Sequence, residues 1–80
     1  MREKAGKDTT PNMNYTIAIH DDPDGGYWAE VPALPGCVSQ GETVAELKAN
    51  IREAIEGYLE VLREDGKQPE PDVQLVKVAV

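Results

Sequence analysis

The chain has 80 residues, which fits one domain; a domain of this size buries only about 60% of its unfolded surface on folding, so self-association would add stability. Its 15 acidic and 8 basic side chains give a formal net charge of -7, which disfavours direct binding to nucleic acid and favours a basic protein partner. The single cysteine, Cys37, cannot form an internal disulfide, and no signal peptide or apolar run of membrane-spanning length is present, so we expect a cytoplasmic protein without membrane contact.

The first twelve residues, MREKAGKDTTPN, show no apolar periodicity and include Gly6 and Pro11. We expect a flexible tail over residues 1–12 and a single domain over residues 13–80. The tail has a net positive charge, so the domain is more acidic than the chain as a whole.

Two runs of alternating apolar residues surround a turn sequence between residues 15 and 31. In each run every second side chain is apolar, as in a half-buried strand: Tyr15, Ile17 and Ile19, then Tyr27, Ala29 and Val31. The intervening run DDPDGG consists of residues that set fixed or positive φ angles or bond their own backbone. We therefore predict a β-hairpin whose turn depends on Asp24, Gly25 and Gly26.

Pro35 and Gly36 are expected to turn the chain again, and a third short strand is predicted over residues 37–40, closed by Gly41. The result is a three-stranded antiparallel meander, which needs a helix or a partner to cover at least one face. We interpret Cys37 as a small buried hydrophobic residue, with a reactive thiol as the alternative.

A long helix is predicted to begin at Thr43, because Thr43 and Glu46 fit the capping box. Apolar residues then recur at helical spacing and form one face: Val44, Leu47, Ile51, Ala54, Ile55, Tyr58, Leu59 and Leu62. The helix should end at residues 64–66, where Gly66 can take the left-handed conformation and Pro69 prevents continuation.

The run VQLVKVAV at residues 73–80 is rich in β-branched residues and predicts a last strand. Apolar residues occupy both parities of this run, so the strand is either central in the sheet or covered by another chain. The predicted order is β-β-β-α-β, an α+β fold with one long helix packed on the sheet. A right-handed crossover would place the last strand beside the first, in sheet order 3-2-1-4.

Trp28 is the main candidate for binding. If Ala29 faces the helix, Trp28 lies on the opposite face of the sheet, near His20 and Glu30. A tryptophan on an uncovered face among small and polar groups has the composition of an interaction hot spot. The alternative is that the parity is inverted and Trp28 belongs to the core.

The remaining charged residues indicate no catalytic or metal site. The hairpin aspartates lack the bidentate acid of a calcium loop, so turn chemistry explains them. His20 has no partner at a recognisable catalytic spacing. We expect no catalytic residue, no metal and no cofactor. Three helix acids form either a solvated face or a further surface for a partner or a second copy: Glu53, Glu56 and Glu60.

The middle of the chain closely resembles the HicB antitoxin family of bacterial and archaeal toxin-antitoxin pairs, through the run DDPDGGYWAEVPALPGCVSQGETVAELKANIREAIEGYLEVLREDG. The family pattern is D-x-x-G-Y-x-A-x-x-P-x-L-P-G-C-x-S-x-G-x-T, followed by an E-A-x-x-N-I-x-E-A-I helix. The resemblance covers roughly residues 15–71. It implies a partial ribonuclease-H-like fold, whose β-β-β-α-β order agrees with the order predicted from the residue pattern.

The resemblance also implies that the protein binds and silences a small basic HicA-like ribonuclease and forms dimers or tetramers. Many family members continue into a DNA-binding domain, and since this chain ends at Val80 we expect a short, stand-alone member that lacks it. Ribonuclease-H-type catalysis needs acids that converge from the first strand, the helix and the last strand, and the two strands offer none, so we expect binding rather than catalysis.

Two alternatives stay open at the level of the sequence. One is a divergent metal-dependent hydrolase or nuclease that uses His20 with the loop of residues 21–24. The other is a solitary oligomeric scaffold without a toxin partner.

Overall fold

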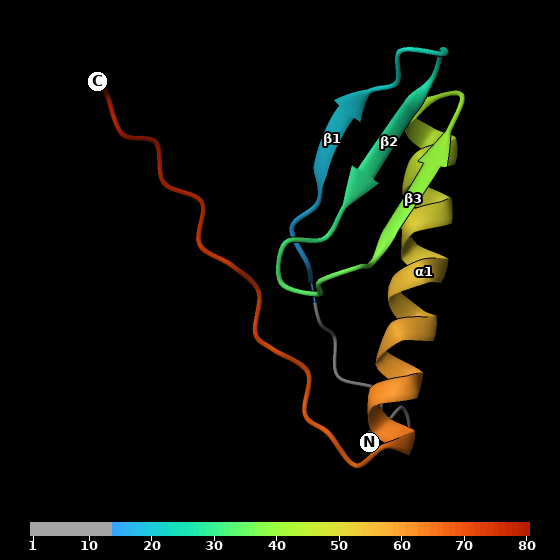
Figure 1. Ribbon diagram of the computed structural model, residues 1–80, viewed down its shortest axis with the longest axis vertical. Helices are drawn as coiled ribbons and strands as arrows, with labels where there is room; N and C mark the ends of the chain where they lie inside the picture. Colours follow the sequence, from blue (N-terminus) through green and yellow to red (C-terminus); the bar gives the residue numbers. More distant parts are fainter. Residues whose placement is uncertain (1–13) are drawn as a thin grey trace, which may run out of the picture.

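The computed structural model describes residues 14–80, so the tail predicted over residues 1–12 lies outside the described residues. It contains four elements: β1 (Ala18–Asp21), β2 (Tyr27–Glu30), β3 (Val38–Gly41) and α1 (Val44–Glu64). The strands form one antiparallel sheet in the order β1-β2-β3, and α1 covers one face of it (Figure 1). The predicted α+β class, the three-stranded meander and the long helix are confirmed.

The turn between β1 and β2 is closed by short-range hydrogen bonds. The amide of Asp22 donates to the Gly26 carbonyl at 3.1 Å, and the amide of Gly25 donates to the Asp22 carbonyl at 2.9 Å. The Asp22 carboxylate accepts from the amide of Asp24 at 2.9 Å, which is the local bonding that aspartate offers in turns. The turn therefore uses the aspartates for its own backbone.

The loop between β2 and β3 contains a second tight turn. The amide of Cys37 donates to the Leu34 carbonyl at 3.0 Å, with Pro35 and Gly36 as the two central residues. Gly36 has φ of 86°, the positive value that the third residue of a type II turn requires. This loop carries several buried side chains, so it closes one end of the core.

Gly41 allows β3 and α1 to approach each other closely. A Cβ at Gly41 would lie 2.6 Å from the backbone nitrogen of Leu47, a separation that backbone atoms do not tolerate. The end of β3 and the first turn of α1 are therefore in contact through a glycine, which fixes the position of the helix over the sheet.

Both ends of α1 are capped by side-chain or backbone groups. The Thr43 hydroxyl accepts from the amide of Glu46 at 3.1 Å, and the Glu46 carboxylate accepts from the amide of Glu42 at 2.6 Å, one residue before the cap. At the other end Gly66 has φ of 72°, and the amide of Lys67 donates back to a carbonyl of the last turn at 2.8 Å. This is the Schellman arrangement.

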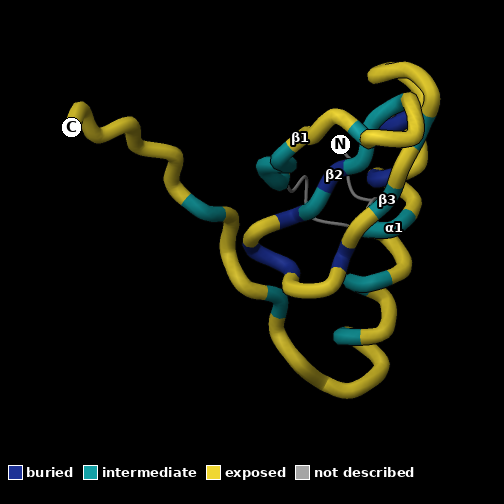
Figure 2. The backbone as a smooth tube through the Cα atoms, turned by 45° about the horizontal axis from the view of Figure 1, so that its top comes forward, coloured by how far each residue is buried: buried dark blue, intermediate teal, exposed yellow. Residues whose placement is uncertain are grey.

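The core lies between the sheet and α1 (Figure 2). Its buried residues come from β2, from the loop after it and from the helix: Ala29, Val31, Leu34, Cys37, Leu47 and Ile51. Burial raises the pKa of the Cys37 thiol, in keeping with its interpretation as a buried hydrophobic residue. Within residues 14–80, no helix combines the length and the apolar character that crossing a bilayer requires.

Residues 73–80, called here the C-terminal segment, are extended but belong to no strand. The fourth strand and the sheet order 3-2-1-4 are therefore not confirmed. Figure 1 shows the segment passing β1 without joining the sheet, and Leu75, Val76 and Val78 are 74% to 77% exposed. The physical reason is that its apolar residues lie on both parities, whereas α1 packs on β3 and β2 and does not reach the outer edge of β1, where the strand would be added.

Candidate functional site

The sheet face opposite α1 carries the candidate binding residues. Ala29 is fully buried against the helix, and side chains alternate along a strand, so Trp28 and Glu30 point to the other side. The register sets His20 of β1 directly opposite Trp28 of β2. Trp28 is half-buried on this face rather than part of the core cluster.

His20, Trp28 and Glu30 form one connected group, called here the open-face cluster. The rings of His20 and Trp28 are stacked, with centroids 4.3 Å apart and planes inclined by 20°. His20 Nε2 lies 2.9 Å from a carboxylate oxygen of Glu30. An ionised carboxylate has no proton to give, so Nε2 carries the proton and donates it.

The open-face cluster suits a basic protein surface. The side chains of His20 and Glu30 are about 42% and 45% exposed, so their outer edges remain available to a partner. A flat aromatic pair beside a carboxylate offers a cation two kinds of contact, one with the π-system and one with the negative charge. Sequence reasoning predicted the three residues, and the register brings them together.

The three predicted helix acids lie elsewhere. Ile51 faces the core, and at 100° per residue Glu53, Glu56 and Glu60 fall on the opposite side of α1, where all three are exposed. Glu56 makes an exposed contact with Arg52 at 3.5 Å, which contributes little to stability. The six predicted partner-binding residues therefore form two surfaces on opposite sides of the molecule.

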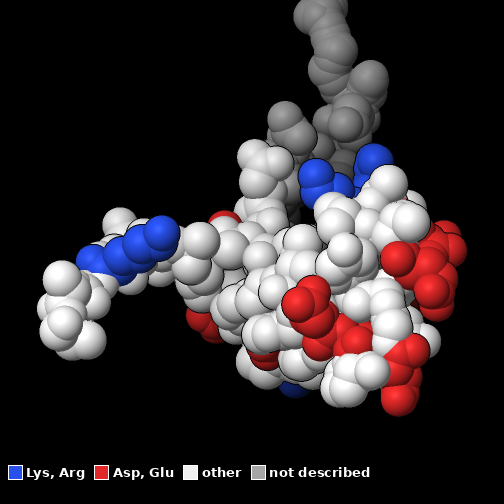
Figure 3. Space-filling view, turned by 90° about the horizontal axis from the view of Figure 1, so that it is seen from above, with Lys and Arg blue, Asp and Glu red and all other residues white. Residues whose placement is uncertain are grey.

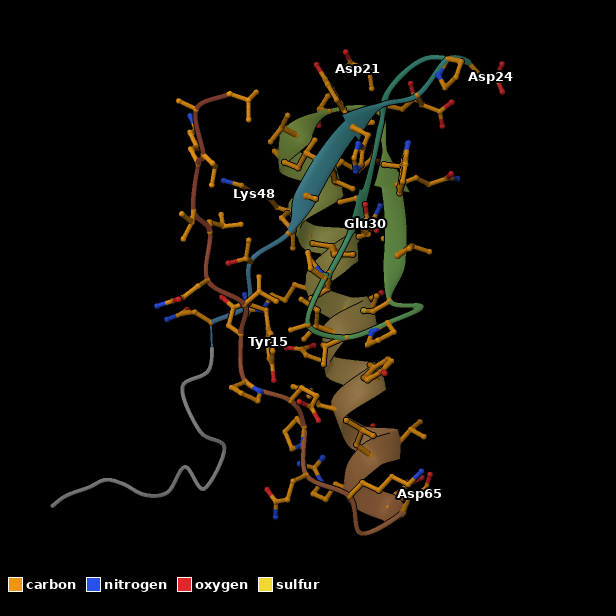
Figure 4. The ribbon with its side chains drawn as sticks, turned by 60° about the vertical axis from the view of Figure 1, so that its left-hand side comes forward. Tyr15, Asp21, Asp24, Glu30, Lys48 and Asp65 are labelled. Carbon is orange, nitrogen blue, oxygen red and sulfur yellow. The ribbon has the colours of Figure 1, made fainter. Side chains whose placement is uncertain are left out.

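A further concentration of acid surrounds the hairpin end of the sheet. Asp22, Asp24, Glu42 and Glu46 line an open depression of about 490 Å³. Figure 3 looks down on this end and shows acidic side chains spread over it, and in Figure 4 Asp24 points away from the body at the tip of the turn. Residues 14–80 contain no group of three His, Cys, Asp or Glu side chains placed to hold a metal ion.

The chain that enters β1 is bonded to the chain that follows α1. The Tyr15 hydroxyl donates to the Glu70 carbonyl at 2.9 Å, and Tyr15 lies against this returning chain in Figure 4. Thr16 donates twice to the Asp72 carboxylate, from its amide at 2.9 Å and from its hydroxyl at 2.7 Å. We call the Thr16–Asp72 pair the clamp.

The clamp changes the ionisation of the groups around it. The backbone and side-chain hydrogen bonds from Thr16 lower the pKa of Asp72. Burial, followed by the negative charges of Asp72 and Glu70, raises the pKa of Tyr15. Sequence reasoning missed this contact because its partners are 56 residues apart and neither belongs to a recognisable motif.

An acidic α+β domain with one sheet face open, and with an aromatic and acidic cluster on that face, has the features of a small protein-binding module. Comparison with known families makes this more specific. Residues 15–79 match the family model described as the HicB-like antitoxin of bacterial toxin-antitoxin systems, and the chain belongs to this family.

Similar proteins occur in archaea and bacteria under the name UPF0150 protein. One from Thermoplasma acidophilum is 48% identical over 56 residues, which span 70% of this chain and 81% of the relative. One from Archaeoglobus fulgidus is 47% identical over 57 residues, with 69% and 83% covered. A third, from Synechocystis sp., is 48% identical over 63 residues, with 79% and 78% covered.

Proposed function

We propose that the chain is the antitoxin of a toxin-antitoxin pair and that it binds and neutralises a small basic ribonuclease of the HicA type. The observation that carries this proposal is the open-face cluster, found in a chain of the HicB-like antitoxin family. Trp28 supplies a half-buried aromatic anchor on the open face, and Glu30 supplies a charge that a basic partner would pair.

The proposed mechanism is competition for the cationic groups of the toxin. A ribonuclease attracts RNA phosphates with Lys and Arg side chains. Carboxylates on the antitoxin attract the same side chains, and complementary charge speeds the encounter and orients it. Once Trp28 is buried in the contact, the toxin surface is closed to RNA.

The acidic charge also gives the chain its other proposed properties. It repels phosphate backbones, so we propose that this chain does not bind nucleic acid directly. From its antitoxin family we also propose that it acts by binding protein and not by catalysis. A ribonuclease partner acts on cellular RNA, so we propose that the complex lies in the cytoplasm.

We also propose that the chain self-associates as a dimer or tetramer and completes its partial ribonuclease-H-like fold in that assembly. The support is the exposed C-terminal segment, whose Leu75, Val76 and Val78 lie in solvent in the single chain. Large apolar side chains exposed side by side favour contact with another protein surface.

The test is co-purification of the untagged chain from its native cell extract, followed by mass identification and a ribonuclease assay. We expect a small basic protein in stoichiometric amount, and we expect its ribonuclease activity to fall in proportion to added chain. A homo-oligomer from cells that express no such partner would instead support the solitary scaffold.

The hydrolase alternative gives a different result in the same assay. In the structure His20 bonds Glu30 rather than a turn aspartate, so the hydrolase has no assembled site among the described residues. Metal-dependent nuclease activity of the chain itself, abolished by His20→Ala, would nevertheless replace the antitoxin proposal.

A further inference from the structure

The C-terminal segment and the outer edge of β1 are both incomplete in the single chain. Among residues 14–80 the sheet order is β1-β2-β3, so within this part of the chain β1 pairs on one side only and its other edge presents unpaired amides and carbonyls. The C-terminal segment is extended, and among residues 14–80 no backbone–backbone hydrogen bond joins it to another part of the chain. The outer edge of β1 lacks a neighbouring strand, and the C-terminal segment is an extended chain that lacks a sheet to join.

The clamp keeps the start of the segment beside the start of β1. Thr16 lies just before β1 and Asp72 just before the segment. Residues 73–80 therefore begin close to the edge of β1. Beyond the clamp, however, the segment diverges from the β1 of its own chain (Figure 1). An extended segment that is held next to a free sheet edge and does not pair with it needs a further contact to stabilise the pairing.

The missing contribution is a second apolar layer. Val73 and Leu75 alternate with Val76, Val78 and Val80, so the segment presents apolar side chains on both faces. α1 packs against β3 and β2 and not against β1, so pairing with its own β1 would leave both faces of the segment in water. In an exchanged pair each segment lies between two bodies, and the second body with its own segment covers the faces that a single chain leaves open.

Charge is compatible with the same occupant. Lys77 is the only charged side chain of the segment, and the rest of the domain is strongly acidic. A segment with one cation therefore meets an attractive surface on a second copy, even though the two bodies repel each other.

We propose that two copies exchange their C-terminal segments, each segment adding as a strand to the outer edge of β1 in the other copy. This inference rests on the proposed self-association and gives it a structural basis. It also supplies the fourth strand that the sequence predicts and the single chain does not form. Backbone pairing provides the affinity, and Val76 and Val78 provide the apolar contact.

The first test compares two valine substitutions in the full-length chain by light scattering over a range of concentrations. Val76→Glu places a charge in the proposed contact, and Val61→Glu places the same charge at a 56% exposed position on α1. We expect the wild type and Val61→Glu to be dimers or larger. Val76→Glu should weaken association by about tenfold or more with unchanged circular dichroism. A monomeric wild type, or wild-type association of Val76→Glu, would overturn the proposal.

The second test shows whether the pairing is between chains or within one. A chain with Ile19→Cys is mixed with a differently tagged chain with Leu75→Cys and oxidised, and Val61→Cys replaces Leu75→Cys in the control mixture. We expect a disulfide between the two chains with Leu75→Cys and none with Val61→Cys. In the double variant Ile19→Cys/Leu75→Cys, closure within one chain alone would reject exchange.

Ribonuclease inhibition separates this inference from the antitoxin proposal. If Val76→Glu remains a dimer and still inhibits the toxin, the exchange is rejected and the antitoxin proposal stands. A Val76→Glu chain that becomes monomeric supports the exchange whether or not a toxin is found.

Discussion

The two faces of the small sheet differ in composition although they share the same strands. On β2, Ala29 is completely buried against α1, while its neighbour Trp28 is half-buried and stacks on His20 in reach of solvent. The covered face joins the loop and the helix in a continuous apolar core, whereas the open face joins an aromatic pair to a carboxylate. Folding therefore depends on one parity of the strand, and the other parity carries the face on which we propose that a partner binds.

The largest effect is expected on the covered face, from Leu47→Ala. Leu47 has no exposed surface, and its removal leaves a cavity between α1 and the sheet. The free energy of unfolding should fall by about 3 kcal/mol, which urea denaturation followed by circular dichroism will measure. A loss below about 1 kcal/mol would mean that the helix is not packed on the sheet through this residue.

The next effect is expected on the open face, from Trp28→Ala. Affinity for the proposed basic toxin should fall by about 2 kcal/mol or more, roughly 30-fold, because a central aromatic anchor is lost. Titration calorimetry measures this loss, and urea denaturation should show a much smaller change in stability than Leu47→Ala gives.

Glu56→Ala tests the second predicted surface, on the side of α1 that faces away from the sheet. This change should leave affinity for the toxin unaltered, since the two positions lie on opposite sides of the molecule. An equal loss at Glu56 would place the partner on the helix instead. Unchanged affinity of Trp28→Ala with reduced stability would make Trp28 a structural residue.

Local patterns in the sequence predict the covered face well because each pattern has a local physical cause. The alternation around the hairpin gives the strands, Thr43 and Glu46 begin the helix, and Gly66 ends it. The same alternation places Trp28 opposite the core. The alternation does not predict that Trp28 stacks on His20, because that contact depends on the cross-strand register.

The predicted last strand is not confirmed in the single chain for a related reason. Residues 73–80 have the composition of a strand, but composition does not say what covers a strand on each side. The clamp was also beyond sequence reasoning, because Thr16 and Asp72 are brought together only by the path of the whole domain. Contacts between distant residues are fixed by the fold and leave no short motif.

The smallest effect is expected at the clamp, which lies at the edge of the sheet and belongs to neither face. Thr16 lowers the pKa of Asp72 below its ordinary value of 3.8. The clamp therefore contributes its full stability at neutral pH, and this contribution declines as the pH falls below 3.8 through the lowered pKa of the folded chain. Because Asp72 is at the surface, the loss should loosen the C-terminal segment without unfolding the domain.

Amide hydrogen exchange of Thr16, followed by NMR between about pH 2 and pH 6, measures the clamp directly, since this amide donates to Asp72. Its protection relative to an unfolded amide should fall in acid, while a β2 amide in the core, that of Ala29, stays protected. Asp72→Ala should remove the protection of Thr16 at every pH. If Thr16 kept its protection in that variant, another group would hold the segment beside β1. That other group, and not the clamp, would then set the starting position of the C-terminal segment in the proposed exchange.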